Sequence, residues 1–164
     1  MALALAASWL WSPLARGAAV TDALVEAVAQ IESSGGRQLV GDGGRAHGAW
    51  QMHAAAWKDT TAFRRRQGQP VWSYRDAHNP AVARLYARDY LTILEQQLRG
   101  ALGQEPTGQL LYAAYNVGFA RLERLRFRLD RTPIATQAAC ARLGALLTEI
   151  TRSSERSLVR TKAD

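Results

Sequence analysis

The chain has 164 residues, of which 48% are hydrophobic. This size and composition favour one globular domain with a single core, and they exclude a protein that is disordered along its whole length. The 21 Lys and Arg residues outnumber the 14 Asp and Glu residues, so the net charge is +7 and the surface favours anionic partners such as nucleic acid, lipid head groups or an acidic polymer. The single cysteine, Cys140, excludes an intramolecular disulfide and is expected in the core.

Residues 1–19 form an apolar segment that ends in three small residues, Gly17, Ala18 and Ala19. Small residues at the end of an apolar segment are typical of a site that a signal peptidase cuts, so we expect a secretory signal here. No basic residue precedes Arg16, and the alternative of an uncleaved hydrophobic N-terminal helix or anchor stays open. No other stretch approaches the ~18 apolar residues that a membrane span needs.

The next segment predicts an amphipathic helix that begins at Thr21 or Asp22 and ends near Ser33, because apolar residues recur at spacings of three and four. Glu32 lies in its last turn. There the negative end of the helix dipole, together with any burial, raises the pKa of a carboxyl toward the range that a general acid requires. If the residues around it are ignored, Glu32 is better explained as an exposed glutamate on the surface.

A loop rich in glycine follows, from residue 35 to residue 48, and its titratable side chains are Asp42 and His47. The loop lacks the spacing of a phosphate-binding P-loop. Asp42 has two interpretations, a residue that shapes the turn or one that takes part in chemistry. His47 and His53 have no further His or Cys at the spacing of metal ligands, so we expect neither a metal site nor a cofactor.

Residues 53–66 predict another helix, and breaks follow at residues 67–70 and around residues 73–79. Further helices are expected after these breaks, so residues 20–152 are expected to form one mostly α-helical domain with little or no β-sheet. Asn79 and Pro80 are a strong helix start, because Asn caps and Pro suits the first helical position. This helix is expected to stop at Gly100. The later helices are expected over residues 110–116, 122–129 and 133–150. Residues 153–164 show no periodicity and predict a flexible tail.

Two arginine-rich stretches, residues 64–66 and 121–131, raise the question of nucleic-acid binding. Solvated helix faces are the commoner explanation of such stretches, and no zinc-finger spacing or RNA-recognition motif accompanies them. We therefore expect no nucleic-acid partner. Tyr115 and Asn116 end a helix, as Glu32 does, and the alternative for Tyr115 is a buried tyrosine whose hydroxyl finds a partner in the core.

Three short segments resemble signatures of one superfamily, in its order and approximate spacing. They are I-E-S-S at residues 31–34, G-A-W-Q at residues 48–51 and A-Y-N-V-G at residues 114–118. They are similar to the E-S, G-L-M-Q and A-Y-N-x-G segments of the soluble lytic transglycosylases and goose-type lysozymes. The resemblance implies a lysozyme-like fold, action on the β-1,4 bond between N-acetylmuramic acid and N-acetylglucosamine of peptidoglycan, and a place in the periplasm, the cell envelope or outside the cell.

The resemblance also implies roles for single residues. Glu32 corresponds to the catalytic acid, and Trp50, which stands where the family has Met, is expected to pack on a sugar. Asp42 lies six positions before Gly48, the offset at which goose-type lysozymes have an Asp. The substrate-binding residues implied by the three segments are Ser33, Gly48, Trp50, Gln51, Tyr115 and Asn116.

Three functions stay open at this point. A lytic transglycosylase needs only Glu32, because the C6 hydroxyl of the muramic acid attacks its own C1 and forms a 1,6-anhydro end. A goose-type hydrolase would use Asp42 to hold a water, with the two carboxyls roughly 6.5–9.5 Å apart. The third is a non-catalytic module that binds glycan within an envelope or phage assembly. Glu32 favours an enzyme, and lytic transglycosylase is the first choice.

Overall fold

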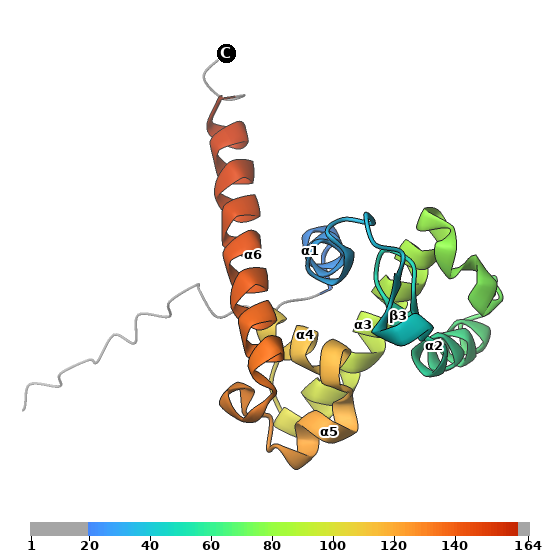
Figure 1. Ribbon diagram of the computed structural model, residues 1–164. Coiled ribbons are helices and arrows are strands. Elements are labelled where there is room, and N and C mark those ends of the chain that lie inside the picture. Colours follow the sequence, from blue (N-terminus) through green and yellow to red (C-terminus); the bar gives the residue numbers. More distant parts are fainter. Residues whose placement is uncertain (1–19, 161–164) are drawn as a thin grey trace, which may run out of the picture.

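A computed structural model describes residues 20–160 and, within them, the side chains of residues 20–153. Figure 1 shows helices gathered around α3, with α2 and a small sheet on one side and α6 on the other. The helices of this described part are α1 (Asp22–Ser33), α2 (Ala54–Arg66), α3 (Pro80–Leu102), α4 (Gly108–Val117), α5 (Phe119–Arg124) and α6 (Ile134–Arg160). This confirms the mostly α-helical fold. None of them has both the length and the apolar character that a membrane span requires.

The helix α3 forms the centre of the domain and packs against α1, α2, α4 and α5. Its start agrees with the sequence: the side chain of Asn79 accepts hydrogen bonds from the backbone N–H groups of Ala81 and Val82, and Pro80 is the first helical residue. The helix runs through Gly100 and ends at Gly103, whose φ is +68°. The predicted stop at Gly100 is therefore wrong, because the left-handed residue that ends a helix occurs only at Gly103. The fully buried side chains of α3 include Tyr86, Leu91, Leu94 and Leu98.

The helix α1 begins and ends as its sequence predicts. The Thr21 hydroxyl accepts a hydrogen bond from the backbone N–H of Leu24, and the helix ends at Ser34 with a left-handed φ of 55°. Its buried side chains Leu24, Val25 and Val28 face the core. The amphipathic pattern is thereby confirmed. It places Glu32 in the last turn, beside the segment that returns as the sheet.

The glycine-rich loop and the residues that follow it, up to His53, contain a three-stranded antiparallel sheet in the order β1-β2-β3. Each strand has only two residues: β1 (Val40–Gly41), β2 (Ala46–His47) and β3 (Met52–His53). A single turn of 3-10 helix, η1 (Asp42–Gly44), joins the first two strands. Two more such turns, η2 (Tyr74–His78) and η3 (Leu129–Arg131), lie before α3 and before α6. The sheet lies between the end of α1 and the start of α2 (Figure 1).

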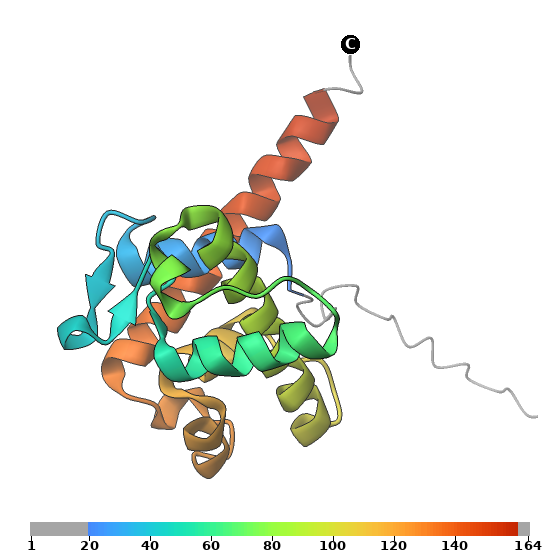
Figure 2. The same ribbon diagram turned by 90° about the vertical axis from the view of Figure 1, so that its right-hand side faces the viewer.

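The helix α6 packs against α1 and α4 with its first half and then projects beyond the body of the domain (Figures 1 and 2). It continues to Arg160 and so includes residues 153–160, for which the sequence analysis expected a tail without regular structure; residues 161–164 lie outside the described part. The physical reason is that residues 145–160 contain no Gly or Pro, so nothing interrupts a helix that packing has already nucleated. The predicted signal segment, residues 1–19, also lies outside the described residues.

Candidate active site

A cleft of about 510 Å³ lies between the end of α1, the sheet and the end of α4. Glu32 reaches it from the last turn of α1, and Asp42 reaches it from the turn between β1 and β2. Both acidic residues that the sequence singles out therefore line the same cleft. The full lining is Glu32, Gln38, Gly41, Asp42, Ala46, Gln51, His53, Tyr115 and Asn116.

Two side chains of α4 hold the carboxyl of Glu32. The Tyr112 hydroxyl donates a hydrogen bond of 2.9 Å to Oε1 of Glu32, and the side chain of Asn116 also hydrogen-bonds the carboxyl. The Asn116 carbonyl oxygen accepts a hydrogen bond of 2.7 Å from the Thr136 hydroxyl, which leaves the amide N–H₂ to face Glu32. Residues four apart lie on one face of a helix, so α4 presents both donors to the acid together.

The environment of Glu32 suits a general acid. Burial raises the pKa of its carboxyl, while the hydrogen bonds from Tyr112 and Asn116 and the nearby His53 offset part of that rise. A raised pKa keeps the proton on a carboxyl at a pH where an exposed glutamate has lost it. Burial and the negative charge of Glu32 also raise the pKa of Tyr112 far above its ordinary value. The phenol therefore stays protonated and remains a donor.

The hydrogen bond from Tyr112 gives a prediction about pH dependence. In Tyr112→Phe, Glu32 loses a donor that stabilises its charged form, so its pKa should rise further above the ordinary value. Activity that requires protonated Glu32 is lost as pH rises through this pKa. The alkaline limb of the kcat/KM profile should therefore move to higher pH, which rates measured across a pH series would show.

Tyr115→Phe is the matched control for this experiment. The Tyr115 hydroxyl donates its hydrogen bond, of 2.6 Å, to the backbone oxygen of Trp50 and not to Glu32. Its removal should leave the alkaline limb where it is in the wild type. An alkaline limb that stays fixed in Tyr112→Phe, or that moves to lower pH, contradicts the role given to Tyr112.

Ser33 is not part of the cleft, which corrects its predicted place as a substrate-binding residue. Its side chain is only 2% exposed. The hydroxyl donates a hydrogen bond of 2.6 Å to the backbone oxygen of Ala49 and accepts one of 2.7 Å from the backbone N–H of Gly36. A small hydroxyl that satisfies two backbone groups at a helix end is a structural tie. Ser33 joins the end of α1 to the loop before β3.

Trp50 is likewise a core residue, and the expectation that it packs on a sugar is wrong. Its side chain is 4% exposed, and its indole N–H donates a hydrogen bond of 2.8 Å to the backbone oxygen of Val25 in α1. A buried indole needs such an acceptor. The large ring belongs to the hydrophobic core, and its hydrogen bond fastens the turn before β3 to α1 at a second point.

Gly48 had been expected in the wall of the cleft. It lies instead where the backbone approaches another segment closely. Its φ is +77°, and a Cβ atom there would lie 2.0 Å from the backbone oxygen of Ala77 in η2. Gln51 does line the cleft. Its side-chain N–H₂ donates hydrogen bonds of 2.9 Å and 2.8 Å to the backbone oxygens of Gln38 and Gly48. Of the three residues predicted from the second segment, Gln51 alone faces the place where a ligand would bind.

Both carboxyl oxygens of Asp42 contact basic side chains. Its Oδ1 lies 2.8 Å from the Arg45 guanidinium, and its Oδ2 lies 3.4 Å from Nε2 of His53. The backbone of Asp42 has a left-handed φ of 48°, which aspartate tolerates better than most residues. These contacts support the interpretation of Asp42 as a residue that shapes the turn, although its side chain borders the same cleft as Glu32.

Two residues of this site escaped the sequence analysis. Tyr112 stands three and four positions before Tyr115 and Asn116, so the helical spacing of Y-A-A-Y-N contained the information that all three share a face. His53 was considered only as a metal ligand. It lines the cleft and approaches Asp42 through the fold of the sheet, and no spacing in the sequence indicated that contact.

The cleft continues along the domain. A smaller hollow of about 240 Å³ shares Gln51, His53, Tyr115 and Asn116 with it. A third hollow, of about 500 Å³, shares Tyr90, Val117 and Gly118 with the second and ends at Arg121 and Arg124 of α5. The three adjoining hollows form a trough along one side of the molecule. A trough of this kind suits an extended polymer better than a small ligand.

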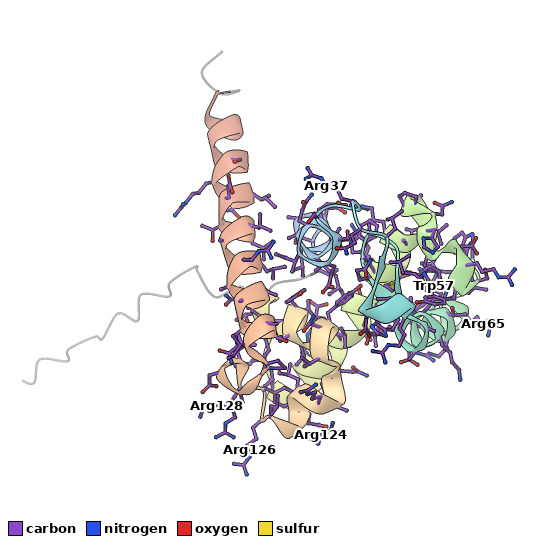
Figure 3. The ribbon with its side chains drawn as sticks, in the orientation of Figure 1. Arg37, Trp57, Arg65, Arg124, Arg126 and Arg128 are labelled. Atoms are coloured by element: carbon purple, nitrogen blue, oxygen red, sulfur yellow. The ribbon has the colours of Figure 1, made fainter. Side chains whose placement is uncertain are left out.

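The labelled arginines in Figure 3 lie at separate places on the molecule. Arg37 and Arg65 point outward near α1 and α2, and Arg124, Arg126 and Arg128 point outward around the end of α5, whereas Trp57 lies inside the domain. All five of these arginine side chains are exposed to solvent.

The helical body, with a partly buried acid beside a long trough, defines a lysozyme-like domain. The chain belongs to the transglycosylase SLT domain family, whose sequence profile matches residues 10–135, more than half of the chain. Proteins of this family act on peptidoglycan, typically in the periplasm or cell envelope. No curated protein and no solved structure matches the chain.

Proposed function

We propose that this protein is a lytic transglycosylase that cleaves the β-1,4 bond between N-acetylmuramic acid and N-acetylglucosamine of peptidoglycan and leaves 1,6-anhydro ends. The observation that carries the proposal is the environment of Glu32: a carboxyl with a raised pKa, held by two donors, at the wall of a trough. Asp42, the other carboxyl of the cleft, is occupied by Arg45 and His53. One available carboxyl is what a transglycosylase requires.

The reaction follows from the state of Glu32. Protonated Glu32 gives its proton to the glycosidic oxygen, and the bond from that oxygen to C1 of the muramic acid breaks. Tyr112 and Asn116 then stabilise the carboxylate that this step creates. The carboxylate takes the proton of the C6 hydroxyl, whose oxygen bonds to C1. The acid is thereby restored, and no water is consumed.

Asp42 distinguishes this proposal from hydrolysis. If Asp42 only shapes the turn, Asp42→Asn keeps most of the activity and the products keep anhydro ends, which weigh one water less than reducing ends. Mass spectrometry of the fragments released from purified sacculi measures this directly. Reducing ends from the wild type, together with a loss of about 10²-fold or more in Asp42→Asn, would instead identify an inverting hydrolase with Asp42 as base.

A non-catalytic glycan-binding module is the remaining alternative. A binding module gains nothing from a carboxyl whose charged form is disfavoured by burial, because such a group costs stability without contacting more ligand. Binding of sacculi without release of any fragment, at every pH tested, would favour the module. The proposed reaction also requires that the protein acts outside the cytoplasmic membrane, where peptidoglycan lies.

A further inference from the structure

Glu95 is a buried carboxyl that plays no part in the proposed reaction. It lies on the core face of α3, between Leu91 and Leu98, and is 8% exposed. Within the described part of the chain, its Oε1 atom is buried and has no hydrogen-bond partner. A buried carboxylate oxygen without a partner costs free energy. A hydrogen-bond donor or a positive charge next to Oε1 of Glu95 would remove this cost.

The charges around Glu95 do not balance. The Arg99 guanidinium lies 3.7 Å from Oε1 of Glu95, but it makes shorter contacts, of 2.8 Å and 3.0 Å, with the two carboxyl oxygens of Glu105. One cation thus serves two carboxylates, and the more buried of the two receives the longer contact. A second positive charge at Glu95 would complete the cluster.

The backbone of Val20 is the other group at this carboxyl. Its N–H hydrogen-bonds Glu95, and its side chain packs against the hydrophobic core. Val20 directly follows Gly17, Ala18 and Ala19, the small residues at which a signal peptidase is expected to cut. The atom that approaches Glu95 is therefore the nitrogen that cleavage after Ala19 would set free.

We propose that residues 1–19 are removed and that the new α-ammonium group of Val20 forms a buried ion pair with Glu95. A signal peptidase hydrolyses the peptide bond between Ala19 and Val20: water supplies the hydroxyl of the new Ala19 carboxylic acid and a hydrogen to the Val20 nitrogen. That amine takes up a further proton below pH ~8. A neutral group with one N–H becomes a cation with three, so Oε1 of Glu95 gains a donor and the cluster gains its second positive charge.

The pair would fasten the beginning of the helix that carries the acid. Asp22, in the first turn of α1, already pairs with Arg84 and Arg88 of α3. The contact of Val20 with Glu95 adds a point further along α3. Removal of the leader thus does more than release the protein, because it completes the attachment of α1 to α3.

The first test locates the cleavage. The full chain is produced in a bacterium that has a signal peptidase, and the protein from the envelope fraction is measured by intact-mass spectrometry and N-terminal sequencing. We expect a chain that begins with Val20. A mature chain that begins at any other residue, or that keeps residues 1–19, overturns the proposal.

The second test measures the ion pair itself. Two chains are compared. One begins at Val20, and the matched chain begins at Ala18, which places its ammonium group two residues upstream. Both chains contain every residue of the hydrophobic core. The thermal midpoint of the Val20 chain should be higher by about 3 °C or more, and Glu95→Gln should abolish this difference. Glu149→Gln, an exposed change on α6, should preserve it.

Equal midpoints for the two native-sequence chains contradict the ion pair, as does a difference that persists in Glu95→Gln. If Glu95→Gln does not fold, the comparison of the two native-sequence chains decides the question alone. Both tests are independent of catalysis, so they stand whether or not the protein proves to be a transglycosylase.

Discussion

Glu32→Gln should lower the rate of peptidoglycan cleavage by about 10²–10⁴-fold while the protein stays folded. The amide has nearly the shape of the carboxyl and can accept the hydrogen bond from Tyr112, but it has no proton to give to the glycosidic oxygen. The decline in turbidity of a suspension of purified sacculi measures the rate. Circular dichroism establishes that the helices remain.

Glu123→Gln provides the matched control, because it makes the same chemical change at an exposed position of α5. It should cleave sacculi at the wild-type rate. A Glu32→Gln protein that clears sacculi as fast as Glu123→Gln would remove Glu32 from the reaction, and with it the proposed mechanism.

Gly48→Ala should be among the most damaging single changes to stability, with a loss of at least ~3 kcal/mol in the free energy of unfolding. Two causes act together. The φ of +77° is strained for any residue with a Cβ atom, and that atom would lie 2.0 Å from the backbone oxygen of Ala77. Because this neighbour is backbone, no side chain can turn aside to make room. Urea unfolding, or a thermal midpoint lowered by roughly 6–12 °C, would register the loss.

Gly43→Ala separates the two causes. Gly43 also has a positive φ, +62°, but no heavy atom lies within 4 Å of the position of its Cβ. Its substitution should therefore cost only the backbone strain, about 1–2 kcal/mol. Equal losses in the two variants would show that close contact with η2 plays no part at Gly48.

The helices were largely predictable because their ends are determined by local chemistry. Thr21 and Asn79 cap α1 and α3 through their own side chains, and such contacts depend on residues only two or three positions apart. Gly100 misled the prediction because glycine ends a helix only where the backbone turns left-handed. The sequence alone does not reveal which of two nearby glycines, Gly100 or Gly103, does so.

The sequence predicted which acidic residues lie in the cleft, but it predicted the other residues that line the cleft only in part. Glu32, Asp42, Gln51, Tyr115 and Asn116 all line the cleft. The side chains of Ser33 and Trp50 point into the structure instead, since a resemblance between segments does not separate residues that touch a ligand from residues that hold the segment in place. Tyr112 could have been found from its helical spacing to Tyr115 and Asn116. His53 belongs to the site through its contact with Asp42 across the sheet, which no local pattern encodes.

The two ties between α1 and the loop before β3 bear on how the site meets its substrate. The Ser33 hydroxyl bonds the backbone of Ala49, and the Trp50 indole bonds the backbone of Val25. Because both ties are buried, Glu32 and the turn before β3, which carries Gln51, move as one rigid unit. The entropy of aligning them is lost once, during folding, rather than at each encounter with a glycan strand. In the proposed reaction, Glu32 is therefore preorganised, and the position of the proton donor is set before a sugar enters the trough.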